Sequence, residues 1–250
     1  MKQYSAEQFE KSLVIFTDGS SLGNPGPGGY GCVIVSKQMD EVIELGGNKV
    51  KTTNNEMELS AVIAALSHSV FNTMPVEIFT DSSYVINGIT KWIHGWEKNG
   101  WKTLAKEDVA NKSLWQNLIS LVREREAANK VVWNYIPGHV GVVGNERCDE
   151  IATSFASGKP EKLFRGKLSE YGRDILNFKI DETLSKEKSK NKSKSSTKAY
   201  SYLSLIDGVA MKHATWAETE ARVKGKNAKF KKAISKENEG EILKEWGAEL

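Results

Sequence analysis

One segment divides this chain before any motif is considered. Residues 185–198 contain six Lys and five Ser and not one aliphatic or aromatic side chain. Such a segment cannot bury enough apolar surface to offset the entropy lost on ordering, so we expect a flexible basic linker. Apolar residues return after it, and Thr215-Trp216-Ala217-Glu218 has the spacing of a helix capping box. The sequence therefore predicts a large unit before the linker and a small α+β module, residues 199–250, after it.

The first 158 residues alternate Val- and Ile-rich runs with helical patterns. Thr53-Asn54-Asn55-Glu56 has capping-box spacing and precedes an Ala- and Leu-rich helix that we expect to reach about Phe71. A Gly- and Pro-rich stretch, residues 18–29, is expected to form a wide turn between the first two strands. Strands first and alternating helices later predict an α/β fold, a mixed five-stranded sheet flanked by helices. The expected strands are residues 13–17, 30–36, 41–47, 76–80 and 131–135.

Four acidic residues stand where these elements would bring them together. Asp18 and Asp81 each close a predicted strand, and Asp149 falls in the first turns of the last helix. Glu58 lies on the apolar row of its helix, whereas Glu56 belongs to the capping box. Converging carboxylates repel by roughly 4 kcal/mol per close pair at an effective dielectric near 20, and oxygen ligands suit Mg²⁺ or Mn²⁺. Taken singly, each acid is also explained as a solvated residue or a helix N-terminal charge.

Four motifs surround these acids. They are Thr17-Asp18-Gly19-Ser20-Ser21 with the Gly- and Pro-rich stretch, Thr52-Thr53-Asn54-Asn55 with Met57-Glu58-Leu59, Thr80-Asp81-Ser82, and Gly138-His139 with Gly144-Asn145-Glu146-Arg147-Cys148-Asp149. In this order and spacing, residues 12–157 resemble ribonuclease H of the type 1 class. The resemblance implies an endonuclease that hydrolyses the RNA strand of an RNA–DNA hybrid with two Mg²⁺ ions, or with Mn²⁺, and leaves 3′-hydroxyl and 5′-phosphate ends.

The same resemblance assigns the reacting residues. Asp18, Glu58, Asp81 and Asp149 would be its metal-binding carboxylates. His139, on a glycine-rich loop, would assist proton transfer or product departure, a role that suits a side chain that titrates near neutral pH. Read without the motif, a single His is more often an ordinary surface residue.

Substrate contacts follow by position in the motifs. The resemblance assigns contacts with the RNA strand and its 2′-hydroxyls to Gly19, Ser20, Asn24, Asn54 and Asn55. An amide can both donate to and accept from a 2′-hydroxyl, the group that separates RNA from DNA. Trp92 and Trp96 lie in a Trp- and Lys-containing segment, residues 92–103, that resembles the basic protrusion with which the family holds the DNA strand. Thr53 and Asn111 match positions that grip a DNA phosphate. Ser83 stands where family members often have Gln.

The C-terminal module resembles the small hybrid-binding domain attached to many such nucleases. Tyr202, Trp216 and Phe230 would offer aromatic faces, and Lys231 and Lys232 would meet phosphates. The family usually places this module before the catalytic domain, whereas here it follows. The alternative is that these aromatic residues form the core of a tiny domain.

The expected organisation is a catalytic domain at residues 1–158, an extension of unassigned packing at 159–184, the linker at 185–198 and the module at 199–250. We expect a monomer that binds RNA–DNA hybrids without an obligate protein partner or a membrane. Two distant cysteines and the absence of a signal peptide or an apolar span favour the cytoplasm. Two alternatives remain: a related metal-dependent nuclease or strand-transfer enzyme, and a non-catalytic hybrid-binding protein.

Overall fold

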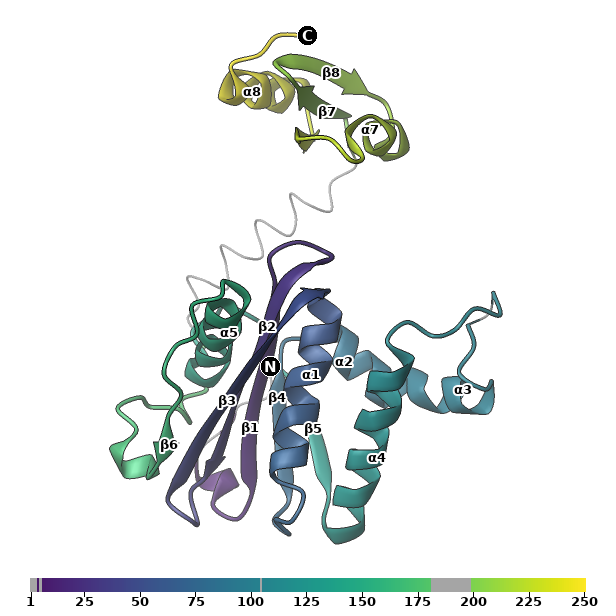
Figure 1. Cartoon of the computed structure of the whole chain (residues 1–250). Coiled ribbons are helices and arrows are strands. Elements are labelled where there is room, and N and C mark those ends of the chain that lie inside the picture. The colour runs from purple at the N-terminus through teal and green to yellow at the C-terminus, as the bar shows by residue number, and fades with distance from the viewer. Residues whose placement is uncertain (1–3, 5, 104, 181–198) are drawn as a thin grey trace. The chain divides into compact units, whose positions relative to one another are not determined.

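The structure, a computed structural model, describes residue 4 and residues 6–103, 105–180 and 199–250 (Figure 1). It divides into two compact units, Met1–Leu184 and Ser185–Leu250. The predicted linker, residues 185–198, lies outside the described residues. In the described parts of the chain, no helix is long and apolar enough to cross a membrane.

A mixed sheet forms the framework of the larger unit. β1 (Leu13–Ser21) pairs antiparallel with β2 (Gly26–Ser36) and parallel with β4 (Val76–Thr80). β3 (Glu41–Thr52) lies beyond β2 and β5 (Val131–Tyr135) lies beyond β4. All five predicted strands are therefore present, and the predicted α/β fold is confirmed.

The structure adds a sixth strand to the five predicted ones. β6 (Arg165–Gly166) has two residues and pairs antiparallel with β3, which completes the order β5-β4-β1-β2-β3-β6. A two-residue strand shows no periodicity in a sequence, so this edge could not be predicted. It belongs to residues 159–180, the described part of the extension, which folds onto the larger unit.

Helices cover both faces of the sheet (Figure 1). α1 (Asn54–His68) packs on β1 and β2, and α4 (Lys112–Ala128) packs on α1, while α5 (Val143–Ala156) covers the opposite face. The strand period of two explains the two layers: Ile15 of β1 belongs to the core cluster under α1, and Phe16 to the cluster under α5.

A continuous helical stretch follows β4. It consists of α2 (Ser83–Asn87), a π-helical turn (Gly88–Trp92) and α3 (Ile93–Lys98). α1 begins with the predicted capping box, because the Thr53 side chain accepts a hydrogen bond from the Glu56 N–H and the Glu56 side chain accepts one from the Thr53 N–H.

The glycine-rich stretch is mostly strand, where a wide turn was expected. β1 and β2 stay paired as far as Ser21 and Gly28, so only residues 22–25 turn. The glycines permit helices to approach: a Cβ on Gly19 would lie 2.2 Å from the Glu58 backbone nitrogen, and one on Gly29 would lie 2.3 Å from the Ala152 carbonyl oxygen. The sequence could not show this, because the contacting atoms are supplied by distant helices.

The smaller unit is the predicted α+β module. Its antiparallel sheet has the order β8-β7-β9, with bounds Ser201–Ile206 for β7, Val209–His213 for β8 and Ala228–Ala233 for β9. α7 (Trp216–Val223) begins with the predicted Thr215 capping box, and α8 (Lys236–Trp246) follows β9.

Candidate active site

Two of the predicted carboxylates lie side by side on neighbouring strands. β1 and β4 run parallel with Thr17 opposite Thr80, so Asp18 and Asp81 follow at the same level of the sheet. Parallel strands bring their carboxyl ends to one edge, which is where α/β folds place reactive groups. The prediction that both acids meet at one edge is supported by this register.

The other two acids arrive from helices on opposite faces of the sheet. Glu58 projects from α1, where its Oε1 accepts a hydrogen bond of 2.9 Å from Asn54 Nδ2 and its Oε2 accepts one from the Ser82 hydroxyl. Ser82 directly follows Asp81, so Glu58 points to the end of β4. Asp149 projects from α5 and is close enough to Asp18 to raise its pKa.

The charges of these acids act on one another. Asp18 is only 8% exposed. Burial, followed by the negative charge of Asp81, raises the pKa of Asp18 to about 8; a 2.7 Å hydrogen bond from the Gly19 N–H lowers it, and Asp149 and Glu58 raise it further. Burial, together with the charge of Asp81, also raises the pKa of Glu58. The site therefore gathers negative charge that its own hydrogen bonds do not neutralise.

A hard divalent cation fits this set of donors. Four carboxylates supply only oxygen, the donor that Mg²⁺ and Mn²⁺ prefer. As the side chains stand, no three His, Cys, Asp or Glu in the described parts of the chain are arranged to hold an ion. The four acids thus match a divalent cation in their chemistry and in their charge. Their present positions do not enclose an ion, since like charges repel, so binding one requires these side chains to move.

His139 lies on the loop after β5, next to the last of the acids. Its Nδ1 is 3.7 Å from Asp149 Oδ2, and its side chain is 65% exposed. The loop also approaches Asp81, because a Cβ on Gly138 would lie 1.8 Å from Asp81 Oδ2. His139 has a φ of 50°, in the left-handed region that is uncommon for this residue. The geometry gives a solvent-accessible imidazole beside Asp149, which is itself half-buried.

Two polar residues support the acids without having been assigned a role from the sequence. Asn145 is 1% exposed, its Nδ2 donates to Asp81 Oδ2 at 3.3 Å, and its Oδ1 has no hydrogen-bond partner. Ser82 accepts from the Val85 N–H at the start of α2 while its hydroxyl donates to Glu58. Both residues lie within the motifs quoted from the sequence. Asn145 precedes Asp149 by one helical turn, and this spacing could have indicated that the two side chains share a face of the helix.

The residues predicted to contact RNA differ in how free they are. Asn24 and Asn55 are exposed and Ser20 is half-buried, whereas Asn54 already donates to Glu58. A Cβ on Gly19 would lie 2.2 Å from the Glu58 backbone nitrogen, so the approach of α1 by itself requires a glycine at this position. Their contacts with RNA stay predictions.

A tyrosine that the sequence did not single out organises the predicted phosphate site. Asn111 begins α4 in the left-handed conformation, with a φ of 59°, and its Nδ2 donates to the Tyr84 hydroxyl at 3.2 Å. Trp115 Nε1 donates to the same hydroxyl at 3.0 Å. Tyr84 lies three residues after Asp81, so it connects the carboxylate edge with the start of α4. Thr53, the other predicted phosphate residue, caps α1.

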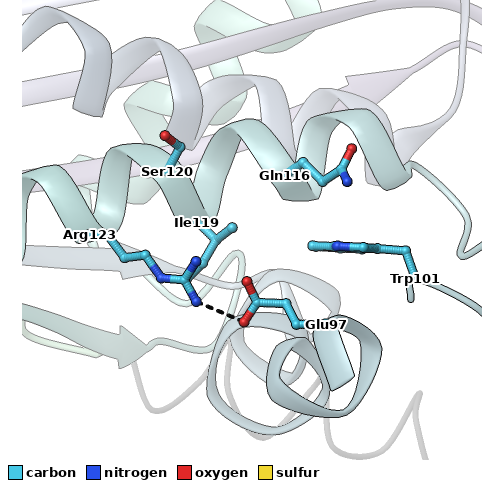
Figure 2. A pocket seen from close by; sticks show the side chains of 6 residues that line it. All are labelled: Glu97, Trp101, Gln116, Ile119, Ser120 and Arg123. Carbon is cyan, nitrogen blue, oxygen red and sulfur yellow. Dashed lines mark hydrogen bonds and ion pairs between the residues drawn. The ribbon is translucent and has the colours of Figure 1, made fainter. Parts of the chain in front are cut away.

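Two hollows border α3, and their charges differ. The first, about 540 Å³, is lined by Lys91, Trp92, Gly95, Trp96, Asn99, Lys102 and Thr103. The second, about 280 Å³, is lined by Glu97, Trp101, Gln116, Ile119, Ser120 and Arg123, and Figure 2 shows Glu97 paired with Arg123 across it, at 2.8 Å. The first is lined by two lysines and two indoles and by no acidic side chain, although Lys102 is paired with Asp108 at 3.1 Å, so it is the better suited of the two to a nucleic-acid strand. It includes both predicted tryptophans.

In the smaller unit, the predicted aromatic residues form a row outside the core. The ring centroids of Tyr202 and Trp216 are 6.0 Å apart, and those of Trp216 and Phe230 are 5.4 Å apart. Trp216 is 43% exposed and Phe230 49% exposed. The core of this unit consists instead of Leu203, Ala233 and Ile242, with Leu243 and Trp246 against them. The alternative that these aromatics are the core is therefore wrong.

The two adjacent lysines of β9 do not share a face. Lys232 lies opposite Tyr202 across the β7–β9 ladder, on the face of the aromatic row. Lys231 lies opposite Leu203, and its Nζ is 2.7 Å from Glu245 of α8. Lys231 therefore points away from the surface where the sequence placed it, because successive strand residues face opposite sides.

Comparison with known proteins agrees with this geometry. Residues 10–157 match the family model described as RNase H. The chain is 47% identical over 156 residues to the ribonuclease H of Shewanella loihica, an alignment that covers 62% of this chain and 94% of the relative. It is 48% identical over 159 residues to that of Pseudoalteromonas atlantica, covering 62% and 99%. The crystal structure of LC9-RNase H1, described as a type 1 RNase H with the type 2 active-site motif, superposes with a TM-score of 0.55 at 26% identity, over 68% of this chain and 87% of that one. The chain therefore belongs to the ribonuclease H family of enzymes.

Proposed function

We propose that this enzyme hydrolyses the RNA strand of RNA–DNA hybrids with two divalent metal ions, Mg²⁺ or Mn²⁺, and leaves 3′-hydroxyl and 5′-phosphate ends. One observation carries the proposal: Asp18 is buried beside three further acids at one sheet edge, with its pKa raised to about 8. When bound, the metal ions supply an activated water and stabilise charge on the leaving oxygen. Asp18, Glu58, Asp81 and Asp149 would hold them.

The remaining residues would position the substrate and move a proton. His139 is exposed beside Asp149, so its imidazole can exchange a proton with the leaving oxygen or with solvent. The exposed amides of Asn24 and Asn55 are available to a 2′-hydroxyl. The basic hollow with Trp92 and Trp96 would receive the DNA strand.

The smaller unit would bind the same hybrid and raise its local concentration. Its row of Tyr202, Trp216 and Phe230, with Lys232 on the same face, combines aromatic faces with a cation. A tethered second site favours longer hybrids and repeated cleavage. Removal of residues 185–250 should then leave the chemistry intact and weaken binding, most visibly at raised salt. Equal affinity of the truncated and full chains across a salt titration would refute this role.

A cleavage assay with labelled duplexes tests the reaction. A hybrid, an RNA duplex and a DNA duplex of one sequence are incubated with and without Mg²⁺, and the ends of the products are mapped. We expect cleavage of only the RNA strand of the hybrid, dependent on the metal. Cleavage or joining of DNA strands would instead favour the related nuclease or strand-transfer reaction.

A further inference from the structure

Residues 159–180 complete the core of the larger unit, although they follow the stretch that matches the family. Tyr171 and Ile175 are 5% and 1% exposed and belong to the same core cluster as Phe16 and Phe79 of the sheet. α5 packs mainly on β1, β2 and β3. The extension therefore covers sheet surface that α5 leaves open, and it does so on the face from which Asp149 projects.

One end of this segment fixes α5 through a buried charge. Glu44 of β3 is 4% exposed and accepts from Arg147 Nε at 2.7 Å, from Arg147 Nη2 at 3.0 Å and from the Tyr171 hydroxyl at 2.5 Å. Arg147 Nη1 also donates to Glu161 of the extension at 2.5 Å. Arg147 precedes Asp149 by two residues on α5. Because a buried carboxylate is costly unless all its partners are in place, this network specifies the position of the helix.

The other end of the segment supports the catalytic loop. The Phe178 ring centroid is 4.7 Å from that of Phe79 and 5.5 Å from that of Phe16, residues that precede Asp81 and Asp18 by two positions. A small cavity of about 50 Å³ separates the extension from the loop, and Pro137 and Val142, on either side of His139, help to line it. Its lining residues are Tyr4, Tyr135, Ile136, Pro137, Val142, Phe178 and Ile180.

The end of α5 that enters the site lacks a side-chain N-cap, although Glu146 accepts a hydrogen bond of 2.9 Å from the Gly141 N–H of the preceding loop. Val142 stands at its N-cap position and makes no side-chain capping bond. A helix without a cap depends more on its tertiary contacts for its position. Glu161 and Arg173 of the extension supply such contacts through Arg147 and Glu150 of α5, while Tyr171 acts on the helix through Glu44. Phe178 lines the cavity that Val142, at the N-cap position, also lines.

We infer that residues 159–180 form a brace that positions Asp149 and the His139 loop for the reaction, with Tyr171 and Phe178 as its positioning residues. The inference rests on the proposed function, because the residues that the brace would position, Asp149 and His139, are themselves proposed to take part in the reaction. Small displacements of reacting groups slow chemistry far more than they weaken binding. The brace should therefore act on kcat and leave the KM for hybrid nearly unchanged.

Four variants of the full chain test the brace. Tyr171→Phe removes the hydroxyl bonded to Glu44, and Phe178→Ala removes the ring beside Phe79. Ser169→Ala is the matched control for the first, since it removes a hydroxyl of the same segment that donates to Asp40 at 3.0 Å. Leu168→Ala is the control for the second, since Leu168 packs on the same core cluster but does not line the cavity at the His139 loop.

Steady-state cleavage of a short hybrid supplies the first readout. We expect kcat to fall about 3-fold in Tyr171→Phe and about 10-fold in Phe178→Ala, with KM within about 2-fold of the original chain. Both controls should keep kcat within about 2-fold, even where Leu168→Ala lowers the unfolding temperature. Equal losses of kcat in the controls, or a loss confined to KM, would overturn the brace.

Amide hydrogen exchange without metal or substrate supplies a second readout. Tyr171→Phe should speed exchange within residues 143–150 and Phe178→Ala within residues 137–142, and Ser169→Ala should do neither. Unchanged exchange in both segments would also overturn the brace. A chain that never cleaves hybrid RNA would instead refute the proposed function, and the exchange measurement would still decide whether the brace exists.

Discussion

The two units of this protein differ in where they place their charged and aromatic side chains. The larger unit buries charge: Asp18 is 8% exposed and Glu44 is 4% exposed, each within a network of other ionisable groups. The smaller unit displays its aromatic rings, with Phe230 49% exposed over a core of few residues. A large two-faced core can offset the cost of crowding carboxylates that have no cation beside them. In the smaller unit, buried Glu239 is instead paired with Lys212 at 2.7 Å. We therefore expect cleavage to depend on residues of the first unit, and we propose that the second unit adds to the affinity for hybrid.

The largest effect should come from the buried carboxylate. Asp18→Asn removes a metal-binding charge, so we expect Mg²⁺-dependent cleavage to fall by about 10³-fold or more while hybrid affinity persists. The same change relieves burial of a charge and repulsion from the neighbouring acids, so the free energy of unfolding of the metal-free chain at pH 8 should rise. Cleavage kinetics and urea unfolding in chelator measure the two effects. Retained turnover, or a less stable variant, would contradict this assignment.

Stability should depend on pH through the same residue. The pKa of Asp18 is about 8 in the folded chain, above its ordinary value of 3.8, so the folded state retains a proton that the unfolded state loses. Asp18 should therefore not oppose folding below about pH 4, and should oppose it increasingly as pH rises to about 8. Urea midpoints of the metal-free chain should fall across this window, and Asp18→Asn should flatten the fall. Identical slopes for both proteins would show that Asp18 is not the group responsible.

The aromatic row should control affinity without affecting the chemical step. The double variant Trp216→Ala, Phe230→Ala should weaken binding of a long hybrid about 30-fold or more, because stacking on an aromatic ring contributes at least about 1 kcal/mol per ring. We expect kcat at saturating hybrid to stay within about 2-fold. Fluorescence anisotropy and single-turnover cleavage separate the two quantities. A lower single-turnover rate would contradict the expectation that the aromatic row affects binding but not the chemical step.

The sequence motifs predicted where the acidic residues lie more fully than the hydrophobic pattern predicted which elements pack together. Asp18, Glu58 and Asp81 could be placed because strand ends and a helix face follow from local sequence. The role of Gly19 could not, because the backbone that approaches it belongs to α1. Tyr171 gave no signal either, since its partner Glu44 lies 127 residues earlier. Such contacts join residues that are far apart in the sequence, so the local periodicity of apolar residues cannot predict them.

For Lys231 and Lys232, which lie on opposite faces of β9, local geometry was more informative than the motif. Strand alternation alone predicts that adjacent residues of β9 face opposite sides, yet the resemblance grouped the two lysines as phosphate contacts. Local geometry was the better guide there, once the strand itself was recognised.

The predicted phosphate contact within the larger unit should give a smaller effect. Tyr84→Phe keeps the ring but removes the hydroxyl that receives Asn111 Nδ2 and Trp115 Nε1. Losing the hydrogen bond that orients Asn111, together with the one from Trp115, should raise the KM for hybrid about 3- to 5-fold and leave kcat nearly unchanged. If Asn111→Ala has no further effect in the Tyr84→Phe background, the two residues act as one unit. Fully additive effects would show that Tyr84 does not position Asn111.

The smallest effect distinguishes two neighbouring lysines of the smaller unit. Lys232 shares a face with Tyr202, whereas Lys231 is 2.7 Å from Glu245 on the opposite side. Lys232→Ala should weaken hybrid binding about 2- to 4-fold and reduce the slope of log affinity against log salt by about 1, since one counterion fewer is released. Lys231→Ala removes the same charge and is the matched control, with an unchanged slope expected. Salt titrations of both variants measure this, and equal slopes for the two would place the nucleic acid somewhere other than on the aromatic face.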